Sequence, residues 1–210
     1  GITCKEYKDA QYTRVPVIQS LLFVHKNKDI ERIISANFIL QFFYAWMVIY
    51  APLYLYNIIG LSWSEIGIIF TIMLTPFVIL EYPLGVIADK YLGEKEILML
   101  GFGIAGTATI VFGTLGESVP LAAWGFVLFL TRVGASMIES MTEIYFFKKI
   151  TDRNTNIISV FRNTIPVAYT IAPIIASVLL FRLPYQALFV ILGFICWMGI
   201  FLSLRIHDTR

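Results

Sequence analysis

The sequence contains few charged residues and almost no cysteine. Only 14% of its 210 residues are Asp, Glu, Lys or Arg, whereas 58% are hydrophobic. This balance excludes an ordinary soluble domain and indicates a membrane protein. The two cysteines, Cys4 and Cys196, are too far apart for a disulfide framework and belong to no metal-ligand spacing, so both are expected to be free thiols.

The residues that carry most enzymatic chemistry are also scarce. His25 and His207 both lie outside the apolar runs, and the sequence shows no nucleophile with a base, no metal-ligand cluster and no phosphate-binding glycine loop. The basic residues form neither a stripe nor an arginine-rich helix. We therefore expect no enzymatic activity, no cofactor, no metal site and no nucleic-acid partner.

Six long apolar runs dominate the sequence. Each is long enough to cross a hydrocarbon core of about 30 Å at roughly 1.5 Å per residue, and unpaired backbone groups in lipid are so costly that each run should be helical. The sequence therefore predicts an all-α membrane protein with a six-helix bundle over residues 32–206. Kinks are expected at Pro52, Pro76, Pro166 and Pro173. The runs lie near 33–56, 63–84, 97–116, 120–145, 157–181 and 185–205.

Charged segments flank the bundle. Residues 1–31 contain a ten-residue apolar patch, 15–24, which is too short to span a bilayer that needs about 20 residues. It is expected to form a short helix on the membrane surface or against the bundle, with a re-entrant segment as the alternative. Residues 207–210 form a tail. Because the first residue is not Met, we expect the chain to be part of a longer protein.

The distribution of Lys and Arg predicts the orientation. On the side of the N-terminal segment the connections are basic, whereas the opposite connections carry Arg182 with the acids Glu65 and Glu117. The excess of basic residues in cytoplasmic loops therefore places both termini in the cytoplasm. The basic residues on that side are Lys90, Lys95, Lys148, Lys149, Arg153, Arg205 and Arg210.

Residues 85–95 form a charged turn between the second and third runs. An apolar run that ends in charges and then resumes predicts a tight cytoplasmic hairpin, in which Gly85 allows two backbones to approach closely. The glycines and charged residues singled out in this turn are Gly85, Asp89, Lys90, Gly93 and Lys95.

Ionisable residues inside the spans cost about 2.5–3.5 kcal/mol each, which marks them as functional candidates. Arg132, Glu139 and Glu143 share one face of the fourth run, and Arg162 lies at a similar depth on the fifth. An Arg162–glutamate pair is predicted, either as a static ion pair or as a network that switches with conformation. Arg132 is expected either to bind an anionic or polar substrate or to pack against backbone carbonyls. Glu81 either joins the network or reaches the interface.

Two further patterns concern the first and third runs. Asn37, Gln41 and Tyr44 share one face of the first run, where they either line a cavity or form hydrogen bonds between helices. The third run has a small residue at every fourth position, which predicts close helix packing. These small residues are Gly101, Ala105, Thr109 and Gly113.

The turn and the six spans together resemble the major facilitator superfamily. The family's turn reads Gly-x-x-x-Asp-Arg/Lys-x-Gly-Arg/Lys. This chain departs from that pattern by one additional residue before Gly93 and by Glu94 ahead of Lys95. Arg132-Val133-Gly134 is similar to the family's Arg-x-x-x-Gly element but shorter in spacing. The positions that match the start of the turn are Gly85, Asp89 and Lys90.

The resemblance implies one half of a twelve-helix transporter, built as two inverted three-helix repeats and corresponding to the C-terminal half. It casts Asp89, Glu143 and Arg162 as a cytoplasmic gate network. The gate motif of this network is the set of turn residues Gly85, Asp89, Lys90, Gly93 and Lys95. The first and fourth spans would line the central cavity, the second and fifth would meet the other half, and the third and sixth would face lipid.

The implied function is transport of a small solute by alternating access in a bacterial-type plasma (inner) membrane. The implied partners are membrane lipid, the other six-helix half and a small-molecule substrate. The alternatives are a non-transporting six-helix scaffold and a self-contained half that dimerises.

Overall fold

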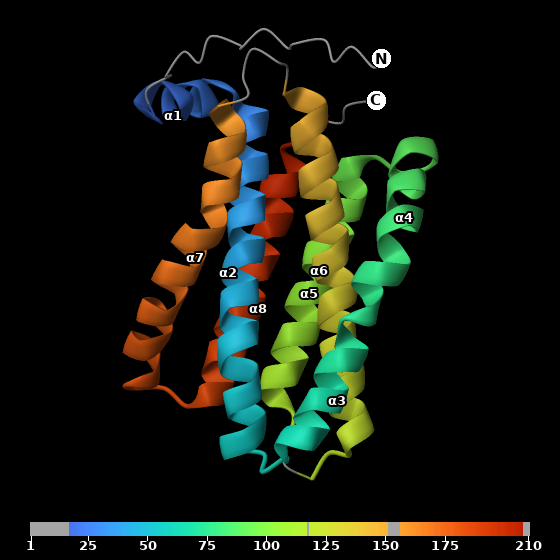
Figure 1. Ribbon diagram of the computed structural model, residues 1–210, viewed down its shortest axis with the longest axis vertical. Coiled ribbons are helices and arrows are strands. Elements are labelled where there is room, and N and C mark those ends of the chain that lie inside the picture. Colours follow the sequence, from blue (N-terminus) through green and yellow to red (C-terminus); the bar gives the residue numbers. More distant parts are fainter. Residues whose placement is uncertain (1–16, 117, 151–155, 208–210) are drawn as a thin grey trace, which may run out of the picture.

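The computed structural model describes residues 17–116, 118–150 and 156–207. Six of the described segments are long and apolar enough to cross a membrane, and α3 and α4 together make one of them, Trp63–Lys90. The predicted all-α architecture with six spans is confirmed (Figure 1). The helices are α1 (Val17–Lys26), α2 (Lys28–Asn57), α3 (Trp63–Met73), α4 (Thr75–Lys90), α5 (Glu94–Thr114), α6 (Leu121–Lys149), α7 (Asn156–Leu180) and α8 (Tyr185–Leu204).

Several helices extend beyond the apolar runs. α2 begins at Lys28 rather than near residue 33, α4 continues to Lys90, and α6 continues to Lys149. An apolar run in the sequence indicates only the part of a helix that lies inside the hydrocarbon core. The helix itself can continue beyond the lipid, because long charged side chains at its end reach water. The expected spans were therefore correct in number and place but too short at the end of the bundle where α1 lies.

The second span is interrupted at Leu74. Pro76 has no backbone N–H to donate to the Ile72 carbonyl one turn back, and proline suits the first turn of a helix, so α4 begins anew at Thr75 instead of continuing α3. The Thr75 hydroxyl donates to the Ile72 carbonyl at 2.8 Å across the interruption. The expected kink at Pro76 is thus a break between two helices, whereas α2 and α7 run without interruption through Pro52, Pro166 and Pro173.

α5 packs with its backbone directly against α6 and α8. A Cβ on Gly101 would lie 2.9 Å from the Gly134 carbonyl oxygen of α6. A Cβ on Gly193 of α8 would lie 2.6 Å from the carbonyl oxygen of Gly106. The close packing expected from the small residues of the third run is therefore confirmed, and Thr109 is fully buried within it with its hydroxyl bonded to the Ala105 carbonyl.

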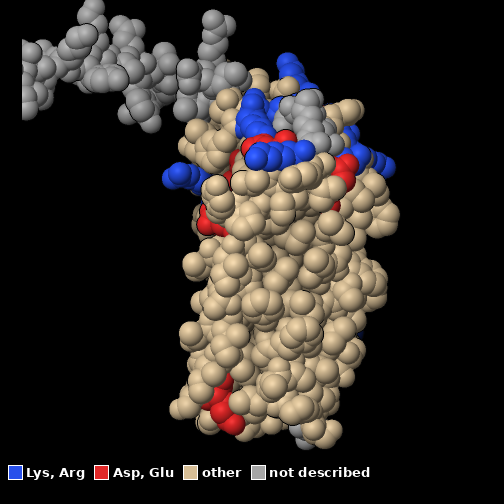
Figure 2. Space-filling model, turned by 90° about the vertical axis from the view of Figure 1, so that its right-hand side faces the viewer, with Lys and Arg blue, Asp and Glu red and all other residues tan. Residues whose placement is uncertain are grey.

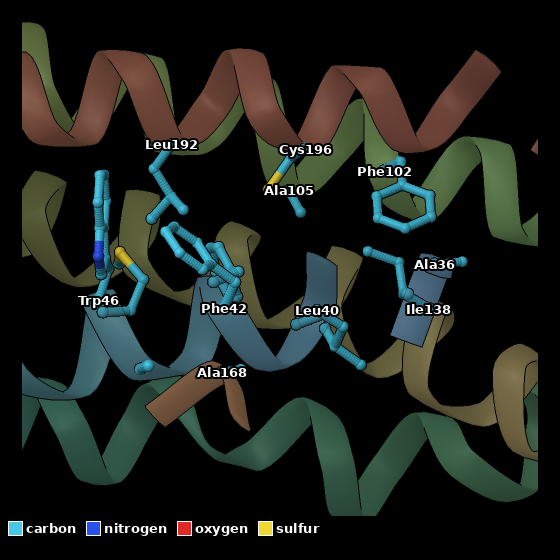
Figure 3. Close-up of a cluster of buried hydrophobic side chains, with 14 of the residues drawn as sticks. Ala36, Leu40, Phe42, Trp46, Phe102, Ala105, Ile138, Ala168, Leu192 and Cys196 are labelled. Carbon is cyan, nitrogen blue, oxygen red and sulfur yellow. The ribbon is translucent and has the colours of Figure 1, made fainter. Parts of the chain in front are cut away.

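α2 occupies the centre of the bundle. Figure 3 shows Leu40, Phe42 and Trp46 of α2 between side chains of α8 and Ala168 of α7. The Trp46 indole N–H also donates to the Ala172 carbonyl of α7 at 2.7 Å. In the apolar stretch of α2 that could cross the membrane, 61% of the residues are buried. The corresponding share is 22% in the second span and 22% in α7. The second and fifth spans are therefore the least buried of the six.

The two described ends of the chain meet at one end of the bundle. The Arg32 guanidinium bonds to Asp29 at 3.1 Å and to the Arg205 carbonyl, and the Tyr145 hydroxyl donates to the His207 carbonyl at 2.8 Å. α1 lies across this end (Figure 1), and Lys and Arg gather there on the face seen in Figure 2.

The short helix expected from the apolar patch is α1. It exposes Ile18, Leu21 and Leu22 and buries Val24. Residues 1–16 and 208–210, and with them most of the expected N-terminal linker and the tail, lie outside the described residues.

Candidate functional site

An acidic cavity of about 230 Å³ lies between α4 and α6. The sequence placed Glu139 and Glu143 on one face of a helix and left open whether Glu81 joins them or reaches the interface. In the structure Glu81 of α4 lines the same cavity as these two acids. Three carboxyl groups thus surround one small volume within the apolar spans. The cavity is lined by Phe77, Glu81, Ser136, Glu139, Ser140 and Glu143.

Tyr44 connects α2 to this cavity. Its hydroxyl donates to Glu139 Oε2 at 2.7 Å, and its ring lies 6.3 Å from that of Phe77. Of the three polar residues in the α2 stripe, Tyr44 is therefore the one that bonds to a residue lining the acidic cavity.

Asn37 and Gln41 instead form hydrogen bonds inside the protein. Asn37 Nδ2 donates to Thr164 Oγ1 of α7 at 2.8 Å, and Gln41 Nε2 lies 3.5 Å from Asn37 Oδ1. Both side chains are buried, with 4% and 8% of their surface exposed. The structure thus favours the interhelical alternative for Asn37, which fastens α2 to α7, whereas Gln41 supports Asn37 from the next turn of α2.

Arg132 is enclosed by aromatic rings of α2. Its Cζ lies 5.6 Å from the Phe43 ring centroid and 5.4 Å from that of Tyr44, and only 2% of the residue is exposed. Its Nε has no hydrogen-bond acceptor, and no ion pair of Arg132 is formed within the described residues. A buried guanidinium held by aromatic faces rather than by a carboxylate retains most of its capacity to bind an anion.

The predicted Arg162–glutamate pair is not formed. Arg162 and Glu143 are both exposed, and neither takes part in an ion pair within the described parts of α6 and α7. The two helices touch through Phe146 and Phe161, whose rings stack at 4.1 Å. Arg162 follows Phe161 directly and so points about 100° around the helix from that contact. The sequence indicates that Arg162 and the glutamates lie at a similar depth in the membrane. It does not indicate how α7 is rotated about its axis, and this rotation turns Arg162 away from α6.

The gate motif makes a different contact from the one expected. Lys148 Nζ, at the end of α6, lies 2.8 Å from Asp89 Oδ1 and 2.8 Å from Glu94 Oε1. Asp89 therefore pairs with Lys148, and the gate network expected among Asp89, Glu143 and Arg162 does not exist in this structure. Glu94, which departs from the family pattern, is the second acid of the cluster, and only 3% of its side chain is exposed.

The other motif residues lie around this cluster. A Cβ on Gly85 would meet only Ile144 Cδ1 at 3.9 Å, so the expectation that Gly85 allows two backbones to approach closely was wrong. Gly93 is buried and precedes α5 as its N-cap. Lys90 is exposed at the end of α4, and Lys95 lies partly buried in the first turn of α5.

The sequence was compared with known families and proteins. The sequence model described as Major Facilitator Superfamily matches residues 33–210. The chain belongs to this family. A comparison with curated proteins found no match. Membership in the major facilitator superfamily makes the chain an integral membrane protein of a transporter family.

Within this major facilitator chain, replacing Tyr44 with phenylalanine should lower the free energy of unfolding by about 1–2 kcal/mol, because Glu139 loses a short, partly buried hydrogen bond. Tyr50→Phe is the matched control, since the Tyr50 hydroxyl lies 3.3 Å from the Pro173 carbonyl and should contribute less. Unfolding in detergent by increasing denaturant would measure both. Equal losses would contradict the specific role of the Tyr44–Glu139 bond.

Proposed function

We propose that this chain is the C-terminal half of a secondary transporter that moves a small solute by alternating access. The observation that carries the proposal is one polar face at membrane depth. Glu81 and Glu143 are exposed on α4 and α6, and Arg162 is exposed on α7. Charged side chains that faced lipid would be costly, so this face must be covered by protein or by a water-filled cavity.

The apolar surfaces beside this face support a second half as the cover. The second and fifth spans are each only 22% buried, and they expose Val78 and Val178 with 86% and 69% of their surface accessible. Two inverted three-helix repeats, formed by α2 to α5 and α6 to α8, would bring these two spans to the same side of the half. α1, lying across the end of the bundle ahead of α2, suits the linker between two halves (Figure 1).

The substrate path in this proposal runs past the acidic cavity. Glu81, Glu139 and Glu143 offer acceptors to a cationic or hydrogen-bonding solute, and Tyr44 links the cavity to α2. Arg132, behind Tyr44, supplies a buried positive charge for an anionic group. Asn37 bonds to Thr164 of α7 and Gln41 bonds to Asn37, so these two residues would hold α2, which carries Tyr44, in place against α7.

The proposed orientation puts the α1 end in the cytoplasm of a bacterial-type plasma membrane. Lys90, Lys148 and Lys149 lie at that end, whereas the loop after α7 carries only Arg182. The gate element on the cytoplasmic side is then the cluster of Lys148 with Asp89 and Glu94.

Thiol labelling tests this proposal without knowledge of the substrate. Cys4 is replaced by serine in the full-length protein, Cys196 is left in place because it is buried, and Ser140→Cys is introduced in the cavity wall. A membrane-impermeant maleimide is then applied to inside-out and right-side-out vesicles. Alternating access predicts labelling of this thiol from both sides, because only a thiol in contact with water ionises and reacts.

Met198→Cys is the matched control. Met198 is 62% exposed on α8, on a surface expected to face lipid, so its thiol should remain unlabelled from either side. If the Ser140→Cys thiol is unlabelled from both sides, the cavity is not on a water path and the non-transporting scaffold is favoured. Labelling from one side only would contradict alternating access.

A further inference from the structure

A long groove runs along the outer face of α5. It has a volume of about 1010 Å³ and shares no lining residue with the acidic cavity. It exists because α5 has small residues on this face, Gly103 and Thr107, whereas α6 and α8 contribute Leu130 and Ile200. A Cβ built on Gly103 would meet nothing within 4 Å, so the floor of the groove is open.

The shape of the groove matches one lipid chain. Its α5 residues run from Glu96 to Val111, sixteen residues that extend about 22 Å along the helix, which exceeds one leaflet of a hydrocarbon core about 30 Å thick. The remaining lining side chains are apolar apart from Thr107. An extended acyl chain along α5 would occupy part of this volume and bury apolar surface on three helices.

Glu96 gives the groove a polar end. Among the described residues it is the only charged one that lines the groove. It lies in the first turn of α5, next to the charged end of the bundle. An acid near a helix N-terminus is favourable in itself. The favourable interaction with the helix N-terminus would be the same on any side of the first turn. It therefore does not explain why the Glu96 carboxyl group borders an apolar groove as long as a lipid chain. A carboxylate in this place attracts a head group that has a primary ammonium, because the ammonium can both pair with it and donate hydrogen bonds.

We propose that the groove binds one phospholipid with an ethanolamine head group, its acyl chain lying along α5 and its ammonium at Glu96. A choline head group is also cationic but has no N–H to donate, so it binds less well. A head group that carries only negative charge is repelled by Glu96. The bound lipid covers the seam between α5 and α6 and fills the hollow over Gly103.

Lipid retention tests this proposal. The full-length protein is reconstituted into vesicles of equal parts phosphatidylethanolamine, phosphatidylcholine and phosphatidylglycerol, and the lipids that remain bound are identified by native mass spectrometry. The parent protein should retain the ethanolamine lipid over the choline lipid by about threefold, the ratio expected for one exposed ion pair with hydrogen bonds. Glu96→Gln should abolish this preference while leaving acyl-chain binding in place.

Gly103→Trp tests the groove itself. The indole would occupy the groove without a backbone clash, and the retained lipid should be lost. Met198→Trp adds the same side chain to an exposed site on α8 outside the groove and should leave retention unchanged. Equal retention of the ethanolamine and choline lipids by the parent, or undiminished retention by Gly103→Trp, would overturn the proposal.

Photocrosslinking decides the question if Gly103→Trp does not fold. A phosphatidylethanolamine with a diazirine in its acyl chain should label peptides of the parent protein that contain Thr107 or Leu130. Labelling confined to peptides of α3 or α7 would place the lipid elsewhere and refute the assignment.

Discussion

Replacing Gly134 with leucine should prevent the six-helix bundle from folding. A Cβ at this position would lie 2.5 Å from the Ala105 backbone nitrogen and 2.6 Å from the Gly101 carbonyl oxygen. Backbone atoms of a packed helix cannot move aside as a flexible side chain can. We therefore expect a loss of about 3 kcal/mol or more, at or above the upper end of the usual cost of overpacking. The measurement is the yield of monodisperse protein on size-exclusion chromatography in mild detergent.

Gly103→Leu is the matched control for this prediction. It makes the same change on α5, but nothing lies within 4 Å of the new Cβ, so the protein should fold at the parent's yield. Normal yield and unchanged unfolding of Gly134→Leu would show that α5 and α6 can separate at no cost. In that case the small residues of α5 would not determine the packing of the bundle.

The sequence predicts the fold well because the bilayer imposes simple rules. Each span must be a helix of a certain length, which fixes the number and place of the six spans. The positions of small residues along the third run also predicted correctly where α5 packs closely. Helix ends were less predictable, because charged residues can continue a helix beyond the lipid. The capping box of Ser62 and Glu65 at the start of α3 has a recognisable spacing, but Glu65 was interpreted only as a loop charge.

The candidate site was only partly predictable, because spacing along a helix gives depth and face but not the neighbouring helix. The shared face of Glu139 and Glu143 was correctly inferred, and both line one cavity. The partner of Arg162 was not, since the rotation of α7 against α6 depends on the packing of Phe146 and Phe161. Lys148 was counted only as a charge that sets orientation, although it lies on the same side of the membrane as Asp89.

Removing the charge of Lys148 should destabilise the junction of α4, α5 and α6 through Glu94 rather than through Asp89. The Asp89 side chain is 62% exposed and regains water, whereas the Glu94 side chain is 3% exposed and does not. Lys148→Met should therefore lower the free energy of unfolding by about 1–2 kcal/mol, less than for a fully buried pair because Lys148 itself is 40% exposed. Unfolding by increasing denaturant in detergent measures this loss.

Two further variants separate this explanation from a general effect of charge. Lys149→Met removes the next lysine, whose Nζ lies 5.5 Å from the Tyr145 ring centroid, and should cost at most about 1 kcal/mol. The double variant Glu94→Gln, Lys148→Met removes both charges together and should recover most of the loss, because no carboxylate then remains buried beside the lost lysine. If the double variant is no more stable than Lys148→Met, the penalty does not come from Glu94. The cluster would then hold the hairpin together through the exposed Asp89 contact alone.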